Sequence, residues 1–221
     1  MKFQELLSLV GDEPLFSTDV LLAGAGASPA AVRLQLSRWV RQRKLILLRR
    51  GLYALAPPYQ RVQPHPFLIA NYLQRPSYVS LQSALAHYGL IPEFTPVVTS
   101  VTTGRPRRWQ TGLGQFEFRH IKKPFWFGFQ LTDLGQNQSA FLATPEKALL
   151  DLIHLQPGGD STAYLQELRL QHLHTLDWER LHAYVERMNA PKLHRALQHL
   201  HQLHHTEEEN YEPLRSPISN L

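Results

Sequence analysis

The chain of 221 residues contains no cysteine. Without thiols it can form no disulfide, no thiolate metal site and no cysteine nucleophile, and this absence fits a reducing compartment. It also lacks any run close to the roughly 18 uncharged apolar residues that a membrane-spanning helix needs. Glu5 interrupts the apolar N-terminus and no small-residue cleavage site follows, so we expect no secretory signal. These absences predict a cytoplasmic protein without a membrane partner.

Acidic residues are missing from one long stretch. None occurs between Asp19 and Glu93, whereas nine Lys or Arg residues lie in that interval. Residues 1–62 hold nine basic and four acidic side chains, and the charges of the remaining residues cancel. The net charge of +5 therefore resides in the first 62 residues. Such a surface suits a phosphate backbone, because each neutralised phosphate releases condensed counterions.

The residue pattern of the N-terminal part predicts three helices and a β-hairpin. Ser28 followed by Pro29 is typical of a helix start, with a capping hydroxyl before a proline at the first helical position. Gly51, between two short apolar runs, is expected at the hairpin tip. The expected helices cover residues 2–10, 17–22 and 28–43, a turn covers 24–27, and the strands cover 45–48 and 52–55.

The third expected helix has two distinct faces. At 100° per residue, one stripe is apolar and consists of Val32, Leu36, Trp39 and Val40. The opposite face is polar, interrupted only by Leu34. Its members are Arg33, Gln35, Ser37, Arg38, Arg41 and Gln42. Arginine reads guanine and glutamine reads adenine in the major groove, so this face suits double-stranded DNA.

A basic hairpin follows this helix, and the combination predicts a winged helix-turn-helix. In that motif the second helix of the pair enters the major groove while neighbouring basic side chains hold phosphates. The expected phosphate contacts are Lys44, Arg49, Arg50 and Arg61. The plainer alternative is a solvated basic face or a protein-docking module. Acid depletion, the polar helix face and the hairpin together favour DNA binding.

Four prolines separate this unit from the rest of the chain. Pro57, Pro58, Pro64 and Pro66 form an extended linker, which places a domain boundary near residue 62. The expected domains are a DNA-binding domain over 1–62, a larger domain over 63–206 and an acidic, flexible tail over 207–221.

The larger domain is expected to be α+β, with a small sheet and several C-terminal helices. Thr144-Pro145 repeats the cap-plus-proline helix start. Strands are expected over 97–101, 116–121 and 125–131, and helices after residues 65, 80 and 144 and over 164–172, 178–188 and 192–205.

Several segments of this domain resemble one family. They are YVSLQSALAHYGLIPE (78–93), TTGRPRR (102–108), FEFRHI (116–121), FGF (127–129) and ATPEKALLDLIHL (143–155). Together with the N-terminal winged helix, their order and spacing resemble the AbiEi antitoxins of abortive-infection, type IV toxin-antitoxin systems. The resemblance covers about residues 1–200.

The resemblance implies a two-domain bacterial phage-defence protein that is not an enzyme. Its N-terminal domain would bind inverted repeats in its own promoter and repress transcription. Its C-terminal domain would counteract a co-encoded nucleotidyltransferase-like toxin, without necessarily forming a stable complex with it. No cofactor is implied.

A second basic surface is expected between the strands of the larger domain. Its members are Arg105, Arg107, Arg108, Arg119, Lys122 and Lys123. It could contact DNA beyond the half-site, an RNA or a toxin, and the alternative is a solvated pair of loops. The aromatic residues between Trp109 and Phe129 could stack on single-stranded bases, but alternating aromatics in strands are more often core.

Other chemistries find weaker support. His201 and His205 have the spacing of a helical metal-ligand pair, but no further ligand motif completes a site. Ser80, His87 and Asp151 lack a nucleophile elbow, so we expect no hydrolytic triad. Lys147 and Asp151 can pair at i, i+4.

Two alternatives to the antitoxin function stay open. One is a transcription factor whose second domain senses a ligand or protein, and the other is an enzyme acting on nucleic acid.

Overall fold

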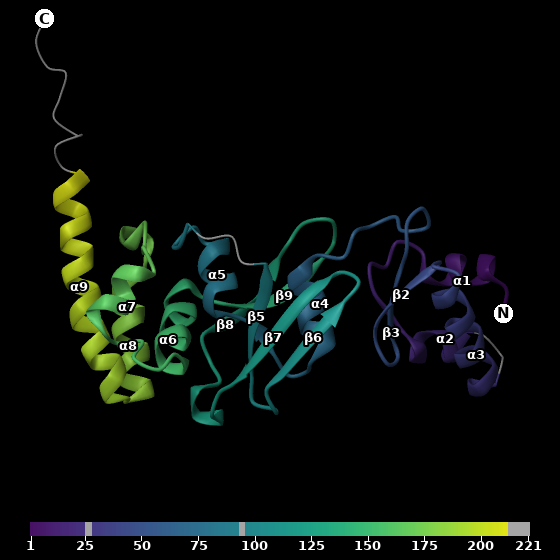
Figure 1. Ribbon diagram of the computed structural model, residues 1–221, viewed down its shortest axis with the longest axis horizontal. Coiled ribbons are helices and arrows are strands. Elements are labelled where there is room, and N and C mark those ends of the chain that lie inside the picture. The colour runs from purple at the N-terminus through teal and green to yellow at the C-terminus, as the bar shows by residue number, and fades with distance from the viewer. Residues whose placement is uncertain (25–27, 93–95, 212–221) are drawn as a thin grey trace, which may run out of the picture.

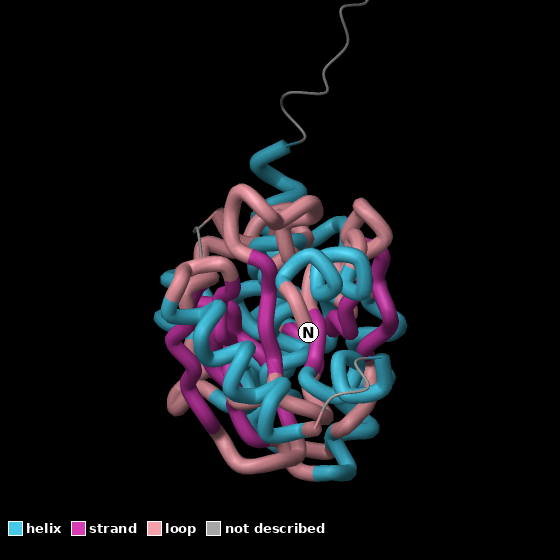
Figure 2. Tube along the Cα trace, turned by 90° about the vertical axis from the view of Figure 1, so that its right-hand side faces the viewer, coloured by secondary structure: helices cyan, strands magenta, loops and turns pink. Residues whose placement is uncertain are grey.

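The computed structural model describes residues 1–24, 28–92 and 96–211. The fold is α+β, as predicted. Figure 1 shows an elongated molecule with the N-terminal unit at one end, the larger sheet in the middle and the last helices at the other end. Seen along the long axis in Figure 2, helices of the N-terminal unit lie in front of the strands. Within the described part of the chain, no helix combines the length and apolarity needed to cross a membrane.

The N-terminal unit contains the three predicted helices and the predicted hairpin. The hairpin gains a third strand, which pairs antiparallel through Phe16 with Tyr53. Sequence reasoning missed this strand and assigned Ser17 to the start of a helix. The helices are α1 (Phe3–Val10), α2 (Thr18–Gly24) and α3 (Pro29–Arg41), and the strands are β1 (Phe16–Ser17), β2 (Leu45–Arg49) and β3 (Leu52–Leu55), in the order β1-β3-β2.

Local signals set the ends of α3. The Ser28 hydroxyl accepts a hydrogen bond from the Ala31 amide at 3.4 Å, as the capping motif predicts. The helix ends at Arg41, two residues before the expected end, because Arg43 takes a left-handed conformation with φ of 57°. Of the predicted turn before α3, residues 25–27 lie outside the described residues.

The apolar stripe of α3 is the centre of the N-terminal core. Val32, Leu36 and Trp39 are almost fully buried, as expected, and the Phe3 ring meets Trp39 edge-on at 5.3 Å. This packing leaves the polar face of α3 directed away from the core. The orientation of that face therefore follows from burial of the opposite stripe.

A six-stranded mixed sheet forms the middle of the molecule, and its strand order is β6-β7-β5-β4-β9-β8. Parallel pairs join β5 to β7 and β4 to β9, and the other pairs are antiparallel. The strands are β4 (Tyr78–Val79), β5 (Val97–Thr102), β6 (Arg107–Thr111), β7 (Gly114–His120), β8 (Phe129–Asp133) and β9 (Ser139–Ala143). The strand expected over 125–131 is shorter and later, because the segment before it forms the 3-10 turn η1 (Lys123–Phe125).

Helices flank this sheet. Figure 1 shows α4 between the sheet and the N-terminal unit, and α5 and α6 between the sheet and the last helices. They are α4 (Pro66–Leu73), α5 (Leu81–His87), α6 (Pro145–Leu155), α7 (Thr162–Glu167), α8 (Trp178–Met188) and α9 (Pro191–Tyr211), with the 3-10 turn η2 (Leu173–Thr175). The helix expected over 164–172 stops early, since Arg169 and His172 both have positive φ.

The expected domain boundary near residue 62 falls in a segment without helix or strand. The two units nevertheless share packing, because Leu15 and Leu48 belong to the large core.

The expected flexible tail needs a correction. Helix α9 continues to Tyr211, and the Glu207 carboxylate accepts hydrogen bonds from the amides of His172 (2.7 Å) and Leu173 (2.9 Å). Residues 212–221 lie outside the described residues.

Candidate nucleic-acid interface and a buried ionic network

The polar face of α3 is exposed over most of its length. Most residues predicted to read bases are solvent-exposed, and Gln35 is half-buried at the edge of the face. The exposed residues are Arg33, Ser37, Arg38, Arg41 and Gln42. Within the described structure, none of these arginines has an acidic partner. Three cations on one helix face are therefore available to an anionic ligand.

Leu34 lies within this basic face. Its side chain is 53% exposed, although leucine normally gains about 2 kcal/mol when it is buried. Sequence reasoning treated it as an intruder. Burial in the core of the N-terminal unit therefore does not account for an apolar side chain at this position of an otherwise polar and basic face. The sequence already placed Leu34 at the centre of the polar face, and this position indicated that its side chain would be exposed.

Of the predicted phosphate contacts, Arg50 is exposed without an acidic partner among the described residues, whereas Lys44 and Arg61 have contacts within the N-terminal unit. Arg50 is exposed beside Gly51 at the hairpin tip and has no acidic partner among the described residues. Lys44 is half-buried, with its ammonium 4.8 Å from the centre of the Phe3 ring. Arg61 forms an exposed ion pair with Asp12 at 3.1 Å. Arg50 is therefore the best placed of these residues to contact a phosphate.

Arg49 has a different role from the one predicted. Its Nε and Nη2 atoms both donate to the Tyr72 carbonyl oxygen at 3.2 Å, and its Nη1 donates to the Arg50 carbonyl at 3.3 Å. The side chain is half-buried and points from the hairpin toward α4. Arg49 thus links the N-terminal unit to the larger unit, and its guanidinium is already engaged by two backbone carbonyl groups.

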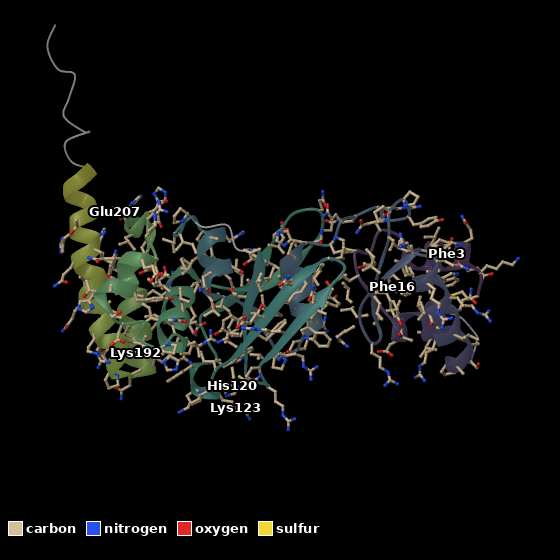
Figure 3. All side chains as sticks on the ribbon, viewed as in Figure 1. Phe3, Phe16, His120, Lys123, Lys192 and Glu207 are labelled. Carbon is tan, nitrogen blue, oxygen red and sulfur yellow. The ribbon has the colours of Figure 1, made fainter. Side chains whose placement is uncertain are left out.

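The second basic surface is smaller than predicted. Arg119 is half-buried and donates from Nη2 to the Leu155 carbonyl oxygen at 2.7 Å, so it holds α6. Arg108 pairs with Glu117 at 3.1 Å. Four exposed side chains remain without an acidic partner among the described residues: Arg105, Arg107, Lys122 and Lys123. Figure 3 shows His120 and Lys123 at one edge of the molecule, near the end of β7.

The backbone that carries this surface is held by the neighbouring elements. Thr102 Oγ1 donates to the Pro76 carbonyl at 2.7 Å and accepts from the Gly104 amide at 3.0 Å. Gln74 Nε2 donates to the Arg105 carbonyl at 2.9 Å, and His120 Nδ1 lies 2.9 Å from the Gly104 carbonyl oxygen. The TTGRPRR segment is therefore fixed at its backbone while its basic side chains extend into solvent.

Most of the aromatic segment expected here belongs to the core. Phe116 and Phe118 are each 1% exposed and Phe127 is 8% exposed, so they cannot stack on a nucleotide. Trp109 is half-buried, and the Arg107 guanidinium lies 5.1 Å from its ring centre. The interpretation of these aromatics as core residues is confirmed for the three buried rings.

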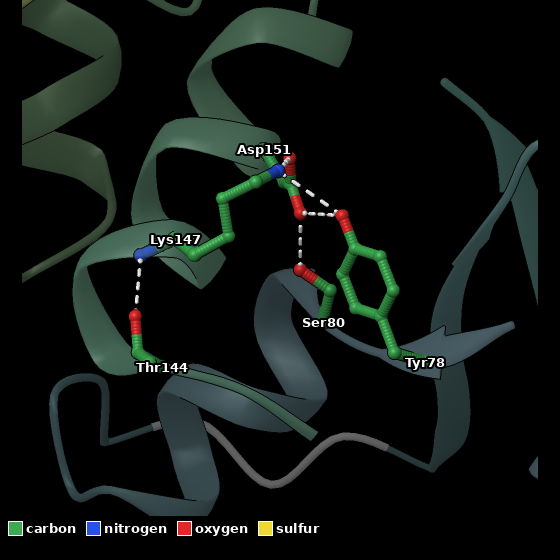
Figure 4. A network of polar contacts seen from close by, with 5 residues as sticks. All are labelled: Tyr78, Ser80, Thr144, Lys147 and Asp151. Carbon is green, nitrogen blue, oxygen red and sulfur yellow. Dashed lines mark hydrogen bonds and ion pairs between the residues drawn. The ribbon is translucent and has the colours of Figure 1, made fainter. Parts of the chain in front are cut away.

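A buried ionic network joins β4, the start of α5, and α6 (Figure 4). Lys147 and Asp151 form the predicted i, i+4 ion pair. Asp151 Oδ2 also accepts hydrogen bonds from Tyr78 Oη and Ser80 Oγ, each at 2.9 Å. The Lys147 ammonium donates to Tyr78 Oη at 3.0 Å. The side chains of all four residues are fully buried, a condition that Lys and Asp almost never meet unless they are paired.

Burial shifts the protonation equilibria of this network. It lowers the pKa of Lys147, although the Asp151 carboxylate acts in the opposite direction. Burial and the same carboxylate raise the pKa of Tyr78, so its hydroxyl stays protonated and continues to donate. Full burial also keeps substrate away from these groups, and their geometry fits a structural role.

The backbone around the network is under unusual constraint. Leu81 has φ of 59°, a strained conformation for a bulky residue, and it directly follows Ser80. Gly128 has φ of 72°, and a Cβ atom there would lie 2.9 Å from Lys147 Cγ. Only glycine allows β8 to start this close to α6.

The network does not contain the triad considered from sequence. His87 packs instead against the rings of Phe67 (5.6 Å) and Tyr88 (5.2 Å), and within the described chain it contacts neither Ser80 nor Asp151. The neighbouring Glu146 is also buried, and its Oε1 accepts from the Asp177 amide at the start of α8 at 3.0 Å. These contacts indicate that α6 organises the larger core.

The C-terminal histidines contact one another and a tryptophan. His201 Nε2 lies 2.9 Å from His182 Nε2, and the Trp178 ring stacks on His201 with centres 4.6 Å apart. Burial lowers the pKa of His201, and neighbouring histidines add to this effect. Across the described ranges, no three side chains of His, Cys, Asp or Glu gather as a metal site would require.

No protein-family profile matches the chain, and a search of curated proteins finds no significant match.

Proposed function

We propose that residues 1–62 form a winged helix-turn-helix domain that binds double-stranded DNA, with α3 in the major groove and the β2–β3 hairpin as the wing. The observation that carries this proposal is the exposed α3 face, where Arg33, Arg38 and Arg41 have no acidic partner among the described residues. The exposed Arg50 at the hairpin tip adds a cation where a wing contacts the backbone.

The residues of this face have separable roles. The arginines are suited to guanine O6 and N7, and Gln42 is suited to adenine. Leu34 is suited to a thymine methyl group. Arg50 would hold a phosphate, which positions the protein without reading sequence. Preference for particular base pairs would thus come from α3, and the hairpin would add sequence-independent affinity.

We further propose that the protein is a bacterial antitoxin that represses its own operon. This step rests on the resemblance of the N-terminal unit and of residues 78–93, 102–108, 116–121, 127–129 and 143–155 to AbiEi antitoxins. The DNA partner would be inverted repeats in its own promoter. The protein would act in the cytoplasm, and its functional partner would be a co-encoded nucleotidyltransferase-like toxin, with which no stable complex is required.

A second candidate function is a transcription factor whose larger unit senses a small molecule. A cleft of about 770 Å³ between the two units favours it, because ligand sites occur preferentially at such boundaries. Gene context separates the candidates. A nucleotidyltransferase-like gene beside this one supports the antitoxin, and its absence supports the sensor.

The DNA-binding proposal is tested by titrating the protein against its own upstream region and against scrambled DNA of equal length. We expect preferential binding that weakens as salt increases, because phosphate contacts release counterions. Fluorescence anisotropy at several salt concentrations measures both properties. Equal affinity for both DNAs would contradict autoregulation.

Two single variants test the division of roles. Arg38→Ala is expected to cost roughly 1–3 kcal/mol on the operator and to relax preference at one base pair. Arg50→Ala is expected to weaken binding to all sequences alike and to reduce the salt dependence by about one phosphate contact. Anisotropy on a panel of single-base operator variants distinguishes these results. Identical profiles for the two variants would refute the assignment.

The antitoxin proposal is tested by growth. Co-expression of this chain is expected to restore growth to cells that express the neighbouring toxin gene. The Arg38→Ala variant serves as a control, because loss of operator binding should leave rescue from a heterologous promoter intact. Failure of the unmodified chain to restore growth would remove the antitoxin role and leave the DNA-binding proposal standing.

A further inference from the structure

A cleft lies between part of the N-terminal unit and the larger unit, beside the packing that the two units share. It is bounded by residues 13–15 on one side and by α4, β8 and β9 on the other. Its volume of about 770 Å³ lies within the range of roughly 300–1,000 Å³ that is usual for small-molecule sites. None of the exposed arginines of α3 lines it, so it is distinct from the DNA-binding face.

One wall of the cleft is aromatic. The rings of Trp126 and Phe129 meet edge-on with centres 5.0 Å apart, and Phe129 meets Phe141 edge-on at 6.0 Å. Leu131 lies opposite Phe141 in the β8–β9 pair, and these two side chains are 61% and 45% exposed. Exposed apolar groups that line a cleft typically mark a binding surface.

Buried amide side chains hold the cleft in shape. Asn71 Oδ1 accepts from the Phe141 amide at 2.6 Å. Gln138 Oε1 accepts from the His65 amide at 2.7 Å, and its Nε2 donates to the Gln63 carbonyl at 2.9 Å. Both residues line the cleft and are at least 92% buried. A ligand would therefore meet walls that are already ordered, which lowers the entropic cost of binding.

The cleft also carries a cation. The Arg75 guanidinium lies 4.3 Å from the centre of the Tyr72 ring, and among the described residues it has no acidic partner. Glu13 also lines the cleft but forms no ion pair with Arg75. An anionic group on a ligand can pair with this guanidinium, and a flat aromatic body can pack on the neighbouring rings.

We propose that this cleft binds a small planar aromatic molecule that carries an anionic group, with the ring system against Trp126, Phe129 and Phe141 and the anion at Arg75. Glu13 also lines the cleft, and its carboxylate would suit a donor group on the same molecule. This site gives the ligand class for the sensor function proposed above as the second candidate, and it does not depend on DNA binding. Its test therefore uses the full chain without DNA.

Two fluorescent probes of nearly the same shape separate the aromatic contact from the charge contact. The anionic probe is 8-anilinonaphthalene-1-sulfonate, and N-phenyl-1-naphthylamine is its neutral counterpart. Equilibrium titration is expected to show saturable one-to-one binding of both to the native protein. Leu131→Glu should lower the affinity for both probes by about tenfold, because it places a carboxylate on the apolar wall of the cleft. Val20→Glu is the matched control, since Val20 is 50% exposed outside the cleft and should change neither affinity.

Arg75→Ala is expected to lower the affinity for the sulfonate probe by about tenfold and to change the affinity for the neutral probe by less than twofold. Arg107→Ala removes an exposed arginine elsewhere and should affect neither probe. Far-UV circular dichroism and the thermal midpoint verify that each variant is folded. The proposal is overturned by absence of saturable binding, by an unchanged affinity in Leu131→Glu, or by an Arg75→Ala effect that is equal for the two probes.

Discussion

Asp151→Asn is expected to lower the free energy of unfolding by roughly 3–5 kcal/mol, because it leaves the Lys147 ammonium buried without a counter-charge. The remaining amide oxygen can still accept from Tyr78 and Ser80. The main loss is therefore electrostatic. For a chain of this length the same change lowers the melting temperature by roughly 10 °C. Urea denaturation followed by circular dichroism measures the effect.

The chain offers a matched control in an exposed ion pair. Arg61 and Asp12 lie 3.1 Å apart, with side chains that are 67% and 72% exposed. Asp12→Asn removes the same charge from this pair and is expected to cost less than about 1 kcal/mol. Similar losses for Asp12→Asn and Asp151→Asn would contradict the importance that we assign to burial.

A second variant distinguishes the uncompensated charge from simple loss of packing. Lys147→Met combined with Asp151→Asn removes both charges and retains an acceptor for the two hydroxyls. The double variant should be more stable than Asp151→Asn alone, since replacing a whole buried ion pair is often neutral. Additive destabilisation by the two substitutions would show that the ion pair is not the source of the effect.

The stability of the single variant Asp151→Asn should depend on pH, and the direction of this dependence follows from the pKa of Lys147. Burial lowers the pKa of Lys147, and Asp151→Asn removes the carboxylate that raises it. The unfolded chain then binds more protons than the folded chain over the interval below the ordinary lysine pKa of about 10.4. Stability of Asp151→Asn is therefore expected to rise, relative to the unmodified protein, as the pH increases from 7 toward that value.

The sequence predicted the elements that begin with strong local signals. Ser28-Pro29 and Thr144-Pro145 start α3 and α6 as expected, and the Thr144 hydroxyl accepts from the Lys147 amide at 3.3 Å. The amphipathic pattern of α3 correctly placed its apolar stripe in the core. These features depend on residues within a few positions of one another, so a single sequence contains the needed information.

Elements that depend on distant partners were missed. Strand β4 contains only Tyr78 and Val79, which is too short for a periodic pattern, and it forms by pairing with β5 and β9. Ser80 occupies the N-cap position of α5 as expected, but its hydroxyl binds Asp151 and makes no capping hydrogen bond. Tertiary contact has replaced the local role that the sequence suggested.

In the candidate interface, too, contacts with distant residues could not be predicted from the sequence. Arg49 and Arg50 are adjacent and chemically identical, yet Arg49 binds the Tyr72 carbonyl while Arg50 is exposed. Arg49 is the last residue of β2 and Arg50 lies in the turn to β3, and residue types alone do not reveal which of the two contacts the larger unit. Charge composition identified the basic region, but only the fold distinguishes its structural arginine from its free ones.

The combined variant Arg33→Ala, Arg38→Ala and Arg41→Ala is expected to weaken operator binding by at least about a hundredfold, since each base contact contributes roughly 1–3 kcal/mol. The three side chains are exposed and alanine favours helix, so the fold of α3 should persist. Anisotropy with operator DNA measures the loss, and a circular dichroism melt verifies the fold.

Loss of positive charge alone could produce part of this effect, and the chain provides a control for it. Arg105→Ala, Arg107→Ala and Lys123→Ala together remove the same charge from the second basic surface. If α3 reads bases, only the α3 variant should lose the difference in affinity between operator and scrambled DNA. If α3 instead holds phosphates, affinity for both DNAs falls together, and the slope of log affinity against log salt decreases by about 0.9 for each lost contact. Equal losses in the two triple variants would show that overall charge determines binding, and the major-groove assignment of α3 would then be wrong.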